Sequence, residues 1–150
     1  MAHTITVSNA DWNKPYYTID LNGLTAFVKG NTYIFQMSSI SGIHPFSVGY
    51  RYKVAGGLSG SGYSASSGKY GSASFEVTIP STYSGTKLKY FCTNHDTMQK
   101  DFAIDVVEPA PPSQAPVAPS NAKCETHTTC PSGHVLKAAA ATTDCARNLC

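Results

Sequence analysis

The chain has 150 residues and a mass of 15.9 kDa, which leaves room for one ordinary domain and an appendage. Charged residues make up only 13%, about half of the typical share of ~25%, so a coiled coil and a highly charged disordered chain are excluded. The net charge of +2 leaves no basic surplus for phosphate backbones, and we expect no nucleic-acid partner. No apolar run approaches the ~18 residues of a membrane-spanning helix, so we expect no membrane span.

Residues 1–107 contain eight short segments in which apolar and polar residues alternate or β-branched and aromatic residues gather. Turn signals such as Asn22-Gly23 and Gly30-Asn31 separate them, and no segment has the spacing of an amphipathic helix. This pattern predicts an all-β fold, either an antiparallel sandwich or a barrel. The predicted strands are Thr4–Val7, Tyr16–Ile19, Thr25–Lys29, Thr32–Met37, Pro45–Val48, Ser74–Ile79, Leu88–Cys92 and Phe102–Val107.

Two stretches have no strand periodicity. Ala55–Gly71 is rich in Gly and Ser, and we expect a long mobile loop there, either beside a binding site or as a variable decoration. Residues 108–120 hold five prolines, a composition that favours an extended, semi-rigid spacer over a loop that hugs the surface. The chain therefore divides into a domain at 1–107, a Pro-rich linker at 108–120 and a Cys-rich segment at 121–150.

Cysteine usage separates one thiol from four. Cys92 stands alone in the β domain, and the other four lie in the last segment, which is too short for a self-sufficient core. We expect disulfides there, with three possible connectivities, and therefore a secreted or periplasmic protein whose signal peptide has been removed. Zinc bound with His127 and His134 is a weaker alternative, because the cysteine spacing departs from common zinc patterns. The four cysteines are Cys124, Cys130, Cys145 and Cys150.

The strongest functional signal begins as a strand and runs into a tight loop at 87–98. Cys92, His95 and Met98 follow one another with two residues between each pair, so one short loop can bring them to a single point. His44 opens another predicted strand upstream. Thiolate and thioether ligands suit Cu(I), while imidazole tolerates Cu(II), so this mixed set suits both oxidation states. Each of these four residues alone is more often structural. Their combination, with a cysteine that has no second cysteine in residues 1–107 to pair with, predicts a metal site.

With these residues in view, the domain resembles the cupredoxins, which are small blue copper proteins. The resemblance covers roughly residues 3–107 and rests on two patches, 44–46 and 90–98. The Cys-x2-His-x2-Met spacing is similar to that of amicyanin. The resemblance to the cupredoxins implies a cupredoxin-like Greek-key β-sandwich of about eight strands. It also implies one type 1 copper, with a trigonal plane of His44, Cys92 and His95 and with Met98 as the weak axial ligand.

The resemblance implies a one-electron carrier that cycles between Cu(I) and Cu(II), and not an enzyme. Such a carrier is expected to be a monomer whose redox protein partner docks near the exposed edge of His95. The alternative is an extracellular copper-binding or interaction domain of a larger secreted or cell-surface protein, without redox traffic. The Pro-rich joint favours it, as does the tail, which resembles short Cys-rich repeats of such proteins. A multicopper oxidase is disfavoured, because the five histidines include no His-x-His pair.

Two positions depart from the family pattern. Many cupredoxins follow the upstream His with a residue whose backbone N–H approaches the cysteine sulfur, and Pro45 has no N–H. Fewer hydrogen bonds leave more charge on the thiolate, so we expect a lowered reduction potential. The second position is Phe91, which stands where plastocyanin has a docking Tyr. The nearby acids are only Asp96 and Asp101, so we do not expect docking through an acidic patch.

Overall fold

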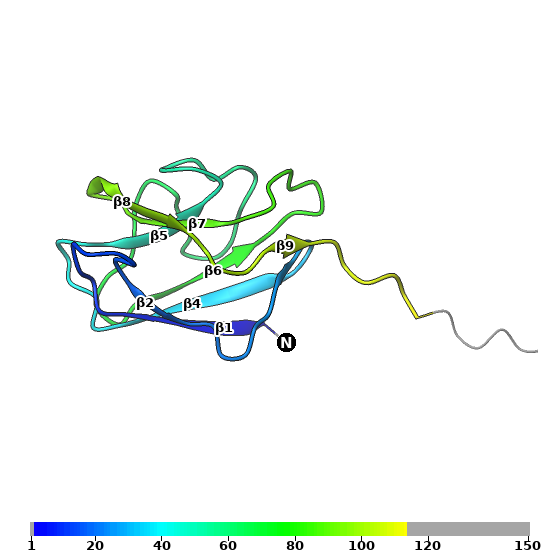
Figure 1. Ribbon diagram of the computed structural model, residues 1–150, viewed down its shortest axis with the longest axis horizontal. Coiled ribbons are helices and arrows are strands. Elements are labelled where there is room, and N and C mark those ends of the chain that lie inside the picture. The colour runs from blue at the N-terminus through cyan, green and yellow to red at the C-terminus, as the bar shows by residue number, and fades with distance from the viewer. Residues whose placement is uncertain (1, 114–150) are drawn as a thin grey trace, which may run out of the picture. The chain divides into compact units, whose positions relative to one another are not determined.

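The computed structural model describes residues 2–113, and in that range the chain forms nine strands and no helix (Figure 1). It therefore contains no helix that is long and apolar enough to span a membrane. The described strands all belong to the first of the two units into which the chain divides, Met1–Ala110, and the four cysteines of the predicted Cys-rich segment lie outside the described residues. The strands are β1 (His3–Ser8), β2 (Thr18–Asp20), β3 (Phe27–Val28), β4 (Thr32–Ser38), β5 (Phe46–Gly49), β6 (Ser74–Thr78), β7 (Lys89–Cys92), β8 (His95–Asp101) and β9 (Val106–Val107).

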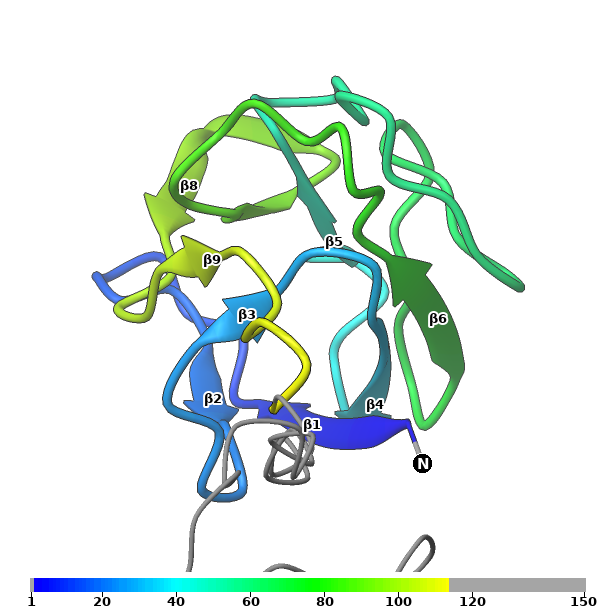
Figure 2. The same cartoon turned by 90° about the vertical axis from the view of Figure 1, so that its right-hand side faces the viewer.

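Two sheets form the body of the first unit. One has the order β2-β1-β4-β6 and the other the order β5-β7-β8, and a short parallel pair joins β3 to β9 (Figures 1 and 2). The prediction of an all-β fold is confirmed, and the two sheets are consistent with a β-sandwich. The prediction of an antiparallel arrangement holds for most strand pairs but is wrong for two, because β1 runs parallel to β4 and β3 runs parallel to β9. Alternation in a sequence identifies a buried strand face but not the neighbour with which the strand pairs.

Aromatic side chains fill the space between the two sheets. Alternation along β4 buries Tyr33, Phe35 and Met37 while the residues between them stay partly exposed. Phe46 of β5 is fully buried and meets Phe35 at 5.9 Å and Phe75 at 6.3 Å between ring centroids. These contacts join β5 of one sheet to β4 and β6 of the other. Burial of such rings supplies most of the packing that holds the layers together.

The last third of the domain differs from the sequence-based expectation. The predicted strand Phe102–Val107 is wrong, because β8 ends at Asp101 and β9 comprises only Val106–Val107. The predicted loop after Cys92 is instead a two-residue turn that leads directly into β8. The sequence does not reveal β8 as a strand, because most of its residues are polar and exposed and buried positions do not alternate along it.

The Gly- and Ser-rich stretch Ala55–Gly71 contains no strand, as its lack of periodicity predicts. It is nevertheless tied to the sheets by isolated bridges from Ser59 to Thr78 and from Lys69 to Phe46. Leu58 is buried within it and adds an apolar anchor. The end of the loop is thereby held beside the start of β5, close in sequence to His44.

Replacing Phe46 with Ala is expected to lower the free energy of unfolding by about 3–5 kcal/mol, because it removes the ring that contacts both sheets. Chemical denaturation of the metal-free protein measures this loss. Tyr70→Ala is the control, since Tyr70 is 58% exposed, and it is expected to change stability by less than about 0.5 kcal/mol. A loss below about 1 kcal/mol for Phe46→Ala would contradict the central place given to this ring.

Candidate metal centre

Three of the predicted ligands converge at one end of the second sheet. The donor atoms of His44, Cys92 and His95 all lie within 4.8 Å of one another. Cys92 Sγ is 3.2 Å from His95 Nδ1 and 3.9 Å from His44 Nδ1, and the two Nδ1 atoms are 3.2 Å apart. Both imidazoles therefore turn the same kind of nitrogen toward the sulfur. Cys92 is buried and makes no disulfide within the described residues.

The size of this triangle fits a metal ion. The point equidistant from the three donor atoms lies inside the triangle, at about 2.0 Å from each atom, which matches metal–imidazole bonds and is about 0.3 Å shorter than a metal–thiolate bond. The two Nδ1 atoms are 3.2 Å apart, too close for both to carry a hydrogen between them, so at least one of them presents a lone pair. Imidazole nitrogens beside a thiol sulfur are a donor set that suits a metal site. The residues could thus hold one metal ion.

Strand pairing brings the three ligands to the same edge. β5 runs antiparallel to β7 with Phe46 opposite Cys92, so the loop that carries His44 meets the end of β7. β7 then turns into β8, and this hairpin places Cys92 directly opposite His95. Residues 44, 92 and 95 thereby meet although 48 residues separate the first two.

Hydrogen bonds outside the ligand triangle lock the two ligand loops together. The amide of Asn94 donates to the carbonyl oxygen of Ile43 at 3.1 Å, and the backbone N–H of Thr93 donates to the carbonyl oxygen of Pro45 at 3.0 Å. The backbone N–H of Gly68, at the end of the Gly- and Ser-rich loop, donates to Thr93 Oγ1 at 3.2 Å. These contacts hold the donor atoms in place through protein bonds alone.

His44 is packed in a way that favours its ligating form. Its side chain is 7% exposed, and burial, followed by the nearby His95, lowers its pKa below the usual value, while Asp11 opposes the shift. A lowered pKa favours the neutral ring, which is the form that binds a metal. The hydroxyl of Tyr17 donates to the carbonyl oxygen of His44 at 3.0 Å and fixes its backbone. Burial raises the pKa of Tyr17, and the nearby Cys92 adds to this shift, so Tyr17 remains a hydrogen-bond donor.

Met98, the predicted axial ligand, is 1% exposed and belongs to the same buried cluster as Cys92. The pairing of β7 with β8 passes from Phe91 opposite Gln99 to Cys92 opposite His95, so residues 96–98 form a bulge at this point. Such bulges redirect side chains beside functional sites. The structure thus brings together three of the four predicted ligands, and ligation by Met98 stays a prediction.

Sequence reasoning missed one residue of the site, Trp12. Its ring centroid lies 4.8 Å from that of His44 in a T-shaped contact and 4.4 Å from that of His95 in a tilted one. The only signal in the sequence is that Trp12 is the single tryptophan and stands in a polar turn. Nothing in its spacing links it to the ligands, because the contact is made entirely by tertiary folding.

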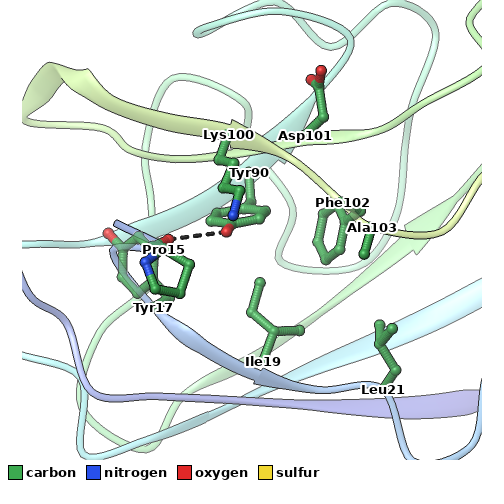
Figure 3. A pocket seen from close by; sticks show the side chains of 9 residues that line it. All are labelled: Pro15, Tyr17, Ile19, Leu21, Tyr90, Lys100, Asp101, Phe102 and Ala103. Atoms are coloured by element: carbon green, nitrogen blue, oxygen red, sulfur yellow. Dashed lines mark hydrogen bonds between the residues drawn. The ribbon is translucent and has the colours of Figure 1, made fainter. Parts of the chain in front are cut away.

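The domain also carries an open, largely apolar groove of about 220 Å³ (Figure 3). Pro15, Tyr17 and Phe102 line it, together with Tyr90, whose hydroxyl donates to the carbonyl oxygen of Pro15 at 2.9 Å. Burial raises the pKa of Tyr90 to about 12. The groove shares Tyr17 with the surroundings of His44, but none of the three converging ligands lines it.

No protein-family model, no curated protein and no solved structure matches the chain. The site is therefore defined by its own geometry, as a His₂Cys cluster in an all-β domain that could hold a metal ion. Within residues 2–113 this is the one such cluster of His, Cys, Asp and Glu side chains. It is thus the candidate functional site of the described part of the chain.

We expect the metal-free protein to bind one equivalent of Co²⁺ with thiolate-to-cobalt absorption, because the sulfur belongs to the triangle of donors. Cys92→Ser should abolish that absorption, as measured by optical titration. His3→Ala is the control, since His3 Nε2 contacts the carbonyl oxygen of Leu21 at 2.7 Å and lies outside the cluster. Equal absorption from the Cys92→Ser variant would show that the metal binds elsewhere.

Proposed function

We propose that the domain is a type 1 copper protein that transfers single electrons by cycling between Cu(I) and Cu(II). The observation that carries this proposal is the convergence of two imidazole Nδ1 atoms and one thiol sulfur around a space of metal-ion size. A trigonal His₂Cys set with a weak axial Met is typical of blue-copper electron-transfer sites. Met98 would supply that axial ligand from the bulge of β8.

Copper is favoured by the mixture of ligand types. A purely structural zinc site is normally closed by four strong ligands, whereas this cluster offers three, with a thioether nearby in sequence. Thiolate stabilises Cu(I) and imidazole accepts Cu(II), so neither oxidation state is strongly disfavoured. When bound, copper would supply the one-electron redox chemistry, and His44, Cys92 and His95 would hold it.

Electron transfer is favoured over copper delivery by the way the ligands are held. Hydrogen bonds from Asn94 and Thr93 to the opposite ligand loop fix the donor atoms before any metal arrives. A fixed ligand set changes little between oxidation states, which keeps the reorganisation that accompanies an electron small. Delivery of copper to another protein instead needs ligands that are exposed and easily exchanged, and Cys92 and His44 are buried.

The proposal includes a cupredoxin-like Greek-key sandwich for the domain and a redox protein partner that docks near His95, which is partly exposed. It also includes an oxidising compartment, secreted or periplasmic, since the lone thiol of Cys92 is accounted for by metal ligation while the other four cysteines remain for disulfides. The alternative of an extracellular interaction domain shares this compartment and predicts a metal site that transfers no electrons.

Adding Cu(II) to the purified metal-free protein is expected to produce intense thiolate-to-copper absorption in the visible range and a narrow copper hyperfine splitting in the EPR spectrum. Both follow from a short copper–thiolate bond in a trigonal site. Cys92→Ser should lose both signals, and His3→Ala should keep them. A pale spectrum with ordinary wide splitting from the unmodified protein would refute a type 1 site.

Pro45→Asn is expected to raise the reduction potential of the copper-loaded protein. The Cys92 sulfur lies within hydrogen-bond distance of two imidazole nitrogens and of the Ile43 carbonyl oxygen, 4.0 Å away, and none of these partners is a backbone N–H. A restored N–H beside the sulfur would withdraw charge from the thiolate and disfavour Cu(II). Voltammetry measures the shift, and Pro45→Ala separates the backbone N–H from the Asn side chain. No shift, or a shift to lower potential in both variants, would contradict this argument.

A further inference from the structure

We propose that Trp12 is a cap over the metal centre, whose indole ring controls how fast a soft metal ion enters and leaves. The proposal rests on the proposed function only in requiring that His44, Cys92 and His95 hold such an ion. Trp12 is no part of the ligand set, and no feature of the sequence assigns it a role. The role is inferred from the position of its ring against both histidine ligands.

The indole ring contacts both imidazoles at once. It meets His44 edge-on, with ring planes 89° apart, and lies tilted over His95 at 59°. Trp12 is nonetheless 59% exposed, whereas His44 is only 7% exposed. One side of the indole therefore faces the ligands while the rest faces water. A large apolar ring at this place excludes water from the imidazole side of the cluster.

The segment that carries Trp12 is an exposed turn closed by its own backbone, with the N–H of Asp11 donating to the carbonyl oxygen of Tyr16 and the N–H of Tyr16 donating to that of Asn13, both at 2.8 Å. Pro15 accepts a hydrogen bond from Tyr90, and Tyr17, two residues further on, donates to the backbone of His44. Residues 11–15 themselves are all exposed, and within this stretch the carboxylate of Asp11 accepts the backbone N–H of Asn13 at 2.9 Å. These bonds hold the turn over the ligands, and residues 11–15 belong to no strand, so displacing Trp12 breaks no strand pairing.

Capping has a direct consequence for metal exchange. A chelator or donor must reach the metal past the imidazoles, and the indole in contact with both rings obstructs that approach. On the remaining sides Cys92 is buried and the loop carrying His44 is bonded to Asn94. The exposed tip of residues 11–15 is therefore the part of the site that opens with the least loss of packing. Exchange should be limited by displacement of Trp12 from the two rings.

Transfer of Cu(I) from the loaded protein to a coloured chelator tests the cap. Trp12→Ala is expected to speed the transfer about tenfold, because two aromatic contacts that must otherwise break are absent. Trp12→Phe keeps a ring over the imidazoles and should stay close to the unmodified rate. Tyr70→Ala is the matched control, since Tyr70 is equally exposed at 58% and no ring contact to His44 or His95 is found for it in the described residues.

Fluorescence gives a second readout that needs no redox chemistry. Trp12 is the single tryptophan, so its emission reports this residue alone. One equivalent of Ag(I), a soft closed-shell ion like Cu(I), should quench the emission in the unmodified protein and leave it unchanged in Cys92→Ser. Unchanged emission with one Ag(I) bound, or equal transfer rates for Trp12→Ala and Tyr70→Ala, overturns the cap. If Cu(II) fails to give a type 1 spectrum while Ag(I) still quenches, the electron-transfer proposal fails and the cap stands.

Discussion

Antiparallel pairing of β5 with β7 is the constraint on which the metal centre depends. The register places Phe46 opposite Cys92, so the loop before β5 and the end of β7 arrive at the same edge of the sheet. A shift by one residue would turn Cys92 toward the opposite face and separate it from His44. The same register sends Phe46 into the aromatic core, where it meets Phe35 and Phe75. Packing of the core and assembly of the ligands are therefore set by one strand pair.

Around that pair the protein supplies its own support for the donor atoms. Asn94 and Thr93 donate hydrogen bonds to the loop that carries His44. Tyr17, which directly precedes β2 of the other sheet, donates to the carbonyl oxygen of His44. Thr93 and Tyr17 are buried and find their hydrogen bonds at the site, as buried polar groups must, while Asn94 adds an exposed one. Ligand geometry is thus fixed by strand pairing and by hydrogen bonds, and a bound ion would adapt to it.

The candidate ligands could be chosen from the sequence because their chemistry is local. Cys92 and His95 lie three residues apart, at a strand end, and a thiol left alone beside four other cysteines needs an explanation. The bulge at residues 96–98 could not be predicted, because it arises from a mismatch between the two strands of the hairpin. Trp12 was equally out of reach, since its contacts with His44 and His95 join a polar turn to two distant segments.

The sequence by itself determined the all-β class, most strand positions and the identities of His44, Cys92 and His95, because alternation, turn residues and ligand chemistry are written in short windows. Only the tertiary structure decided that β1 runs parallel to β4, that the two imidazoles present Nδ1 to the sulfur, and that an indole ring contacts both of them. Those features depend on which distant segments become neighbours. That choice is made by packing over the whole core, which no short window of sequence contains.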